Sequence, residues 1–181
     1  MRFKVLRSDW IGLLILTLFS LGAGLLINQF REKPLPLVYQ TKAERLEESV
    51  QNIRLGEAGA TPAKSQITLS ESITLEEFSQ YVEAKQGLIL DARPRLFYLR
   101  GHVPGALSLP REDFERSYTV LREKLETNRS QPIVIYCSDA ECEDSKLVRD
   151  SLKKLGSTNL SLFELGWSAW TASGKLEESS R

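Results

Sequence analysis

Two cysteines, Cys137 and Cys142, are the residues of this chain best suited to covalent chemistry. Cys137 ends an apolar run at 132–137, and helical periodicity begins about six residues later. In an open α/β sheet, ligands bind beyond the carboxyl ends of the strands, where loop N–H groups and a helix N-terminus favour an anion. We therefore expect a thiolate at position 137 to be stabilised, nucleophilic and reachable from solvent. Its position alone leaves open a second interpretation, a buried and inert cysteine at a strand end.

The predicted strands and helices that must position these cysteines alternate along the chain. Thr74 and Glu77 form a capping box, which predicts the start of a helix. Strands that alternate with helices and are apolar throughout predict a parallel sheet covered on both faces. The runs that predict strands lie at 67–69, 88–92, 107–109, 132–137 and 160–163.

Four stretches, in this order along the chain, resemble a rhodanese (sulfurtransferase) domain. They are LILDARP at 88–94, GHVPGALSLP at 101–110, PIVIYCSDAEC at 132–142 and LGWSAW at 165–170. The resemblance covers residues 67–178 and implies an α/β fold, in which helices flank both faces of a five-stranded parallel sheet.

The same resemblance implies roles for individual residues. Cys137 is then the catalytic nucleophile, while Asp91 and Arg93 support the cysteine loop and His102 shapes a neighbouring turn. The implied substrate loop is Ser138, Asp139, Ala140, Glu141 and Cys142. The implied activity is a double displacement: Cys137 takes up a sulfane sulfur as a persulfide, and a thiol or another nucleophile then removes it. The implied partners are a small sulfur donor or a protein persulfide or thiol, and no cofactor is implied.

The acidic character of this loop departs from thiosulfate-using members of the family, whose loops contain Arg or Lys. The acidic residues here are Asp139, Glu141, Glu143 and Asp144. Carboxylates repel a dianionic substrate and raise a thiol pKa. Glu143 and Asp144 also have an explanation without a functional role, because acidic side chains are stabilising near a helix N-terminus. A neutral, cationic or protein-bound sulfur donor therefore fits this loop better than thiosulfate.

Cys142 keeps two further functions open. It could resolve a Cys137 persulfide by forming a Cys137–Cys142 disulfide, or act with Cys137 as a thiol-redox pair; it could also be a packed, uninvolved thiol. A non-catalytic rhodanese-like module that binds or senses a partner is the other alternative. No metal site is expected, because two cysteines and the distant His102 do not make a zinc-ligand set.

Residues 10–30 contain no charged side chain and are dominated by Leu, Ile, Gly and Phe. A helix of that length spans roughly 31 Å, close to the thickness of the bilayer core. We expect an uncleaved, single-pass transmembrane helix after a tail at 1–9; a cleaved signal peptide is the main rival. An N-terminal tail this short usually stays in the cytoplasm. We therefore expect the rest of the chain on the extracytoplasmic (periplasmic) side.

Residues 31–66 are predicted to link the membrane helix to the domain at 67–178, and 179–181 form a short tail. The linker includes a charged helix at 41–55 with Leu46, Val50 and Ile53 on one side, which either acts as a spacer or lies on the domain. The domain carries 14 basic and 18 acidic residues, so its net charge is −4. An acidic domain argues against nucleic acid as a partner.

Overall fold

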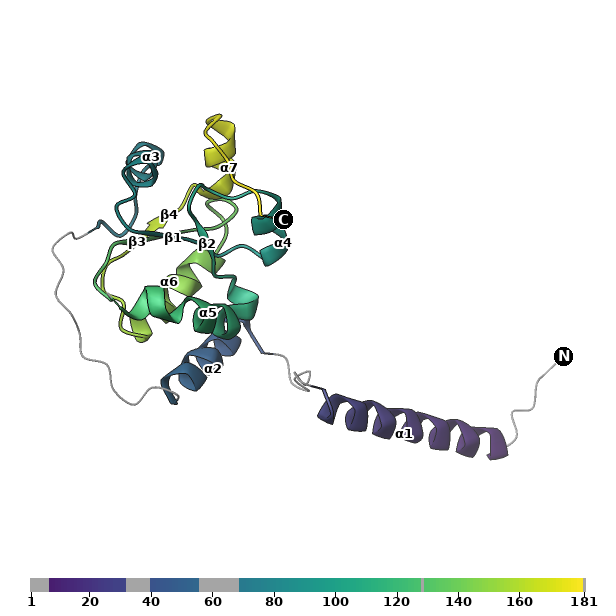
Figure 1. The fold of residues 1–181 in the computed structure, drawn as a ribbon. Helices are drawn as coiled ribbons and strands as arrows, with labels where there is room; N and C mark the ends of the chain where they lie inside the picture. Colours follow the sequence, from purple (N-terminus) through teal and green to yellow (C-terminus); the bar gives the residue numbers. More distant parts are fainter. Residues whose placement is uncertain (1–6, 32–39, 56–68, 128, 181) are drawn as a thin grey trace. The chain divides into compact units, whose positions relative to one another are not determined.

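The computed structural model describes residues 7–31, 40–55, 69–127 and 129–180 (Figure 1). The chain divides into two compact units, residues 1–40 and residues 41–181. The predicted linker stretches at 32–39 and 56–66 lie outside the described residues.

The first unit contains helix α1 (Arg7–Gln29). Its segment Gly12–Gln29 is long and apolar enough to cross a membrane, although a signal sequence has the same features. Leu14, Leu18 and Phe19 are among the apolar side chains that α1 leaves exposed. The predicted apolar helix is therefore confirmed, and its helical residues begin three positions earlier than expected.

The second unit is built on a parallel sheet with the strand order β2-β1-β3-β4. Its register pairs Leu90 of β1 with Leu107 of β2 and with Ile135 of β3, which in turn lies opposite Leu162 of β4. The strands are β1 (Leu88–Asp91), β2 (Leu107–Ser108), β3 (Ile133–Tyr136) and β4 (Leu160–Phe163). The predicted α/β class and parallel sheet are thus confirmed.

The predicted number of strands is wrong for the described part of the chain, which contains four strands and not five. Residues 67 and 68 of the expected first strand lie outside the described residues, and Leu69 is not in a strand. Next to β4 the chain makes only one isolated parallel bridge, from Ser72 to Leu162. Thr74 then caps α3 (Leu75–Ala84) two residues later, so the chain leaves the sheet edge before a strand can form.

Helices cover both faces of the sheet (Figure 1). Helices α3 and α7 lie on one face, and helices α2, α5 and α6 lie on the other. Strand β3 shows why two cores form: Ile133 and Ile135 pack on the α2/α5/α6 side, while Val134 and Tyr136 pack on the α3/α7 side. The remaining helices are α2 (Lys42–Leu55), α4 (Arg95–Arg100), η1 (Arg111–Asp113), α5 (Phe114–Glu126), α6 (Asp144–Lys154) and α7 (Gly166–Ala172).

Helix α3 begins at the predicted capping box. The Thr74 side chain accepts a hydrogen bond from the Glu77 N–H, and the Glu77 carboxylate accepts one from the Thr74 N–H at 2.8 Å. The helix ends at Lys85, which adopts a left-handed conformation with φ 49°. Gly87 lets two backbone segments approach closely, since a β-carbon there would lie 2.1 Å from the Pro132 carbonyl oxygen.

Helix α2 lies on the domain and is not a free spacer. Leu46, Val50 and Ile53 are buried in the same core as residues of α5 and α6. Two polar contacts fasten α2 to the end of α6, since Arg54 donates to the Lys154 carbonyl oxygen and Glu47 pairs with the Lys154 ammonium. Helix α2, which was predicted as part of the linker, therefore contributes buried side chains to the core of the domain.

Candidate functional site around the cysteine loop

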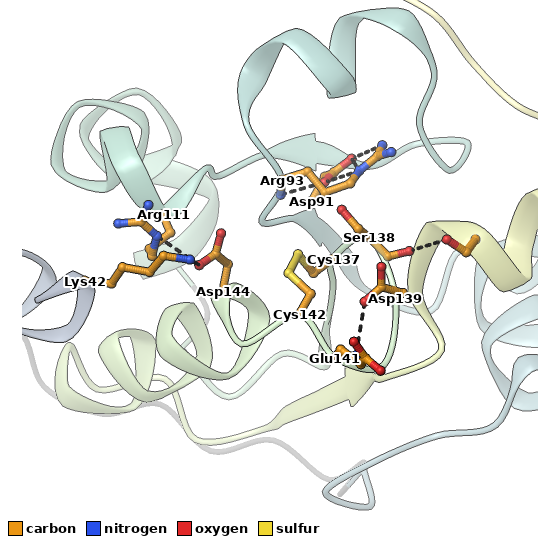
Figure 2. Close-up of a disulfide and its surroundings, with 11 residues drawn as sticks. Lys42, Asp91, Arg93, Arg111, Cys137, Ser138, Asp139, Glu141, Cys142 and Asp144 are labelled. Atoms are coloured by element: carbon orange, nitrogen blue, oxygen red, sulfur yellow. Dashed lines mark hydrogen bonds and ion pairs between the residues drawn. A yellow bond between two sulfur atoms is a disulfide. The ribbon is translucent and has the colours of Figure 1, made fainter.

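Cys137 directly follows β3 at the carboxyl edge of the sheet, as the sequence predicted. Its sulfur is bonded to that of Cys142 in a disulfide that closes a loop between β3 and α6 (Figure 2). The two α-carbons lie 6.1 Å apart. Of the alternatives left open for Cys142, a separate packed thiol does not apply to this form of the protein.

The disulfide limits access to Cys137. The residue is only 2% exposed, whereas Cys142 is partly exposed. The expectation of a solvent-reachable thiolate at position 137 is not met in this form, because the sulfur is bonded to its neighbour. Cys137 can act as a nucleophile only after the disulfide has opened.

The start of α7 fixes the position of the loop. The N–H groups of Trp167 and Ser168 donate to the carbonyl oxygens of Cys137 (2.8 Å) and Ser138 (2.9 Å). The Ser168 hydroxyl also donates to the Ser138 carbonyl, at 2.9 Å. Gly166 makes this approach possible, since it has φ +63° and a β-carbon there would lie 2.6 Å from the Cys137 carbonyl oxygen. The LGWSAW stretch at 165–170 therefore supplies backbone N–H groups that hold the cysteine loop in place.

Asp139 organises the loop from within. Its carboxylate oxygen Oδ1 accepts a hydrogen bond from the Glu141 N–H at 3.1 Å, and its carbonyl oxygen accepts one from the Cys142 N–H at 3.2 Å (Figure 2). Aspartate commonly stabilises turns in this way. Asp139 thus has a structural role, and the N–H groups of Glu141 and Cys142 point back into the loop. Glu141 and Ala140 are exposed.

Asp91 and Arg93 form a buried ion pair after β1, beside the cysteine loop (Figure 2). The Arg93 guanidinium donates to both Asp91 oxygens, with the shortest contact 2.6 Å, and the Arg93 backbone N–H adds a bond of 2.9 Å. The Tyr136 hydroxyl donates to Asp91 Oδ2 at 2.7 Å and accepts from the Val103 N–H at 3.2 Å. This network joins the ends of β1 and β3.

Arg93 extends the network toward α7. Its Nη2 donates to the Gly101 carbonyl oxygen at 2.7 Å, and its guanidinium lies 4.5 Å from the centre of the Trp167 ring. Burial acts to lower the pKa of Arg93, but its bonds to Asp91 outweigh burial and raise that pKa. Burial, reinforced by Asp91, raises the pKa of Tyr136 well above its usual range. Both groups therefore hold their protons at every working pH.

His102 is packed into its turn. It is 3% exposed, its ring stacks on Tyr98 with centroids 3.9 Å apart, and its Nδ1 lies 2.9 Å from the Tyr98 carbonyl oxygen. Its backbone pairs with Glu178, and the Glu178 carboxylate accepts a bond from the Gly105 N–H at 3.0 Å. These contacts hold the His102 ring within its turn, and the shaping role stays a prediction.

An ion-pair cluster that the sequence did not predict lies beside the disulfide. Asp144 is buried at the start of α6, and its Oδ1 lies 3.0 Å from Arg111 Nε of η1 and 3.3 Å from Lys42 Nζ of α2 (Figure 2). Lys42 is 102 positions away in sequence. No local pattern connects the two, so only the packing of α2 on the domain reveals the contact.

One group of potential metal ligands occurs among the described residues, and it coincides with this site. An oxygen of Asp144 and the sulfurs of Cys137 and Cys142 all lie within 4.8 Å of one another. Both sulfurs belong to the disulfide, and zinc needs thiolates. The donor set present in this form therefore does not fit a zinc site.

The comparison with protein families gives one match, to the rhodanese-like domain, over residues 74–173. That segment includes the sheet, the cysteine loop and α7, and it begins after α2. No curated protein matches this chain.

Solved structures similar to this chain include two with TM-scores above 0.5, which show the same fold. The solution structure of the rhodanese-like domain of the Alr3790 protein from Anabaena sp. is 26% identical, with a TM-score of 0.51, and the match covers 61% of this chain and 80% of that one. The BH2092 protein from Bacillus halodurans is 17% identical, with a TM-score of 0.52, and the match covers 74% and 86%. The human single-domain sulfurtransferase TSTD1 is 18% identical, with a TM-score of 0.48, and the match covers 57% and 97%.

Proposed function

Because this chain belongs to the rhodanese-like domain family, we propose that it is a membrane-anchored sulfurtransferase. Cys137 carries sulfane sulfur as a persulfide and passes it to a thiol or another nucleophile. The observation that supports this most is the place of Cys137: it follows β3 at the carboxyl edge of a parallel sheet, in a loop whose carbonyls are held by α7. Ligands of open α/β sheets bind at that edge.

The disulfide adds a step before transfer. Two thiols reduce the Cys137–Cys142 bond, form a disulfide between themselves and leave two thiols on the chain. The Cys137 thiolate then attacks the outer sulfur of a persulfide donor, and the donor leaves as a thiolate. An acceptor thiolate next attacks the outer sulfur on Cys137, and the Cys137 thiolate leaves unchanged. Asp91, Arg93 and His102 take no part in these bonds and hold the surrounding loops.

The charge of the loop favours particular donors. Glu141 and Glu143 are exposed on the cysteine loop, and Asp139 lies between them and Cys137. A thiosulfate dianion would approach against these carboxylates. Neutral, cationic or protein-bound persulfides are therefore the proposed donors.

Helix α1 is the proposed membrane anchor, and the extracytoplasmic side is the proposed location of the domain. The length and apolar character of α1 support the first proposal. The disulfide supports the second, because disulfides persist mainly in oxidising compartments. A membrane-impermeant maleimide, added to intact cells after an impermeant phosphine reductant, labels the cysteines if this topology is right. Labelling only after lysis contradicts it.

Sulfur transfer is tested on the reduced full-length chain in detergent. Cysteamine persulfide and 3-mercaptopropionate persulfide form a matched cationic and anionic pair of donors, and N-acetylcysteine is the acceptor. We expect catalysed transfer with wild type and with Cys142→Ser, only the uncatalysed background rate with Cys137→Ser, and faster catalysed transfer from the cationic donor. Equal transfer by Cys137→Ser and wild type contradicts the proposal.

A thiol-redox function is the second candidate, and the Cys137–Cys142 disulfide is the observation that favours it. In that function the disulfide accepts two electrons from a partner dithiol, which is oxidised to a disulfide while both cysteines are protonated. Cys142→Ser separates the two candidates, because it abolishes oxidation of a dithiol substrate but leaves a Cys137 persulfide able to form.

A further inference from the structure

The cysteine loop contains no basic residue, but two cations from elsewhere in the chain reach its end. Arg111 comes from η1 and Lys42 from α2, and both contact Asp144, two residues after Cys142. Asp144 in turn lies within 4.8 Å of both sulfurs. This series of contacts places the cations within about 10 Å of the sulfurs, comparable to the screening length at 0.1 M salt.

We propose that Lys42 and Arg111 are positioning residues that supply the positive charge the cysteine loop lacks, and so make Cys137 ionise more readily once the disulfide is open. The proposal rests on the proposed function in that it concerns the same nucleophile. Without the cations, the carboxylate of Asp144 would oppose a thiolate next to it, since like charges disfavour ionisation. With them, that carboxylate is neutralised by two partners.

Lys42 also extends the site beyond the family's domain. The family match begins at residue 74, whereas Lys42 is the first residue of α2. Its place does not depend on the disulfide, because α2 is held by the buried side chains of Leu46, Val50 and Ile53 and by contacts with Lys154. The preceding helix thus completes the electrostatic surroundings of the site.

The remaining charged groups around the sulfurs do not replace these cations. Arg93, the other cation near the loop, is engaged by Asp91 in the buried pair. The charged residues that Figure 2 labels around the disulfide are Asp139 and Glu141 of the loop, Asp144 of α6, Arg111 of η1, Lys42 of α2, and Asp91 with Arg93 after β1. Among these labelled groups four are acidic and three are basic, so loss of Lys42 or of Arg111 leaves the surroundings of the sulfurs more negative.

The test measures the pH dependence of iodoacetamide alkylation at Cys137, by peptide mass spectrometry, in the reduced full-length chain in detergent. We expect Lys42→Met to raise the pKa of the Cys137 thiol, so that alkylation at pH 7 falls about threefold. Arg111→Met should have the larger effect, because the Arg111 side chain is 14% exposed, whereas that of Lys42 is 61% exposed. Asp144→Asn shifts the pKa the other way, and alkylation rises about threefold.

Three controls separate charge from structure. Lys42→Arg should keep the wild-type pH profile of alkylation. Lys146→Met removes an exposed cation of α6 and should leave that profile unchanged. About 0.5 M NaCl should reduce the effect of Lys42→Met, because salt screens the charge.

An unchanged profile in Lys42→Met, or a shift of Asp144→Asn in the same direction as Lys42→Met, overturns the inference. If wild type takes up no sulfur while these pKa shifts appear, the proposed function fails and the inference stands. If sulfur is taken up and the shifts are absent, the inference fails and the proposed function stands.

Discussion

The α-carbon of Gly166 lies so close to Cys137 that a β-carbon on residue 166 would come within 2.6 Å of the Cys137 carbonyl oxygen. This contact joins the start of α7 to the cysteine loop. It lets the next two N–H groups, of Trp167 and Ser168, bond the loop carbonyls. The shape of the loop therefore depends on a glycine 29 positions after the cysteine.

Replacing Gly166 by alanine is expected to destabilise the fold at this contact. The positive φ costs about 1 kcal/mol and the clash adds to it, so we expect the free energy of unfolding to fall by about 2–4 kcal/mol in denaturant titrations of the full chain. Gly174→Ala is the matched control, because its φ is +67° but nothing lies within 4 Å of its β-carbon. Equal losses in the two variants would show that the backbone conformation alone matters.

The hydroxyl of Tyr136 is expected to stabilise the junction of β1 and β3. Tyr136→Phe removes the donor to Asp91 and the acceptor of the Val103 N–H, both buried, so the free energy of unfolding should fall by about 1–3 kcal/mol. Because burial and Asp91 raise the pKa of Tyr136, the hydroxyl stays protonated and the loss should be the same from pH 6 to 9. Tyr118→Phe is the comparison: its hydroxyl bond to Glu126 is partly buried, so the effect of losing it should be smaller. A loss that disappears toward pH 9 contradicts this account.

The place of α2 in the core leads to a third prediction. Val50 is 1% exposed, so Val50→Asp buries an unpaired carboxylate and should lower the free energy of unfolding by about 3 kcal/mol or more. Gln51→Asp, at the exposed neighbouring position, should have little effect. Urea unfolding followed by Trp fluorescence compares the two. If both variants unfold like wild type, α2 does not stabilise the domain.

The capping box of α3 should give a pH-dependent contribution. Its bonds to Thr74 hold the pKa of the Glu77 carboxyl below the ordinary value of 4.5. A lowered folded-state pKa stabilises the fold above the unfolded pKa, and that gain is lost as pH falls through the folded pKa. Wild type should therefore exceed Glu77→Gln in stability at neutral pH, and the gap should close as the pH falls from 4.5 through the lowered folded-state pKa.

Glu83→Gln provides the comparison for this titration, since Glu83 is exposed on the same helix outside the capping box. Thermal unfolding from pH 3 to 7 measures both variants against wild type. A gap for Glu77→Gln that stays constant with pH, or an equal one for Glu83→Gln, would refute the linkage.

Local patterns in the sequence predicted the parts of the fold that depend on local chemistry. Thr74 and Glu77 marked the start of α3, and the apolar run at 132–137 marked the central strand. Leu46, Val50 and Ile53 identified the buried side of α2 but not the surface it covers. The fifth strand was predicted from the run at 67–69 and from the family resemblance, but near that run the described chain makes one isolated bridge, from Ser72 to Leu162.

The surroundings of the cysteines depend on contacts that no short pattern encodes. The Cys137–Cys142 pairing was one of several open alternatives, because spacing alone does not fix whether two thiols meet. Asp139 looked like a charge that acts on substrate, and its turn-forming bond emerged only with the loop geometry. Lys42 reaches Asp144 across 102 positions because two helices pack together.

The most direct test of the proposed function is the mass of the Cys137 peptide after the reduced full-length chain has been incubated with a cationic persulfide donor and trapped with iodoacetamide. We predict a gain of about 32 Da, one sulfur atom, on Cys137 of wild type and of Cys142→Ser, which disappears when an acceptor thiol is added. No gain on Cys137 with cationic, neutral or protein-bound donors would contradict sulfur transfer by this chain.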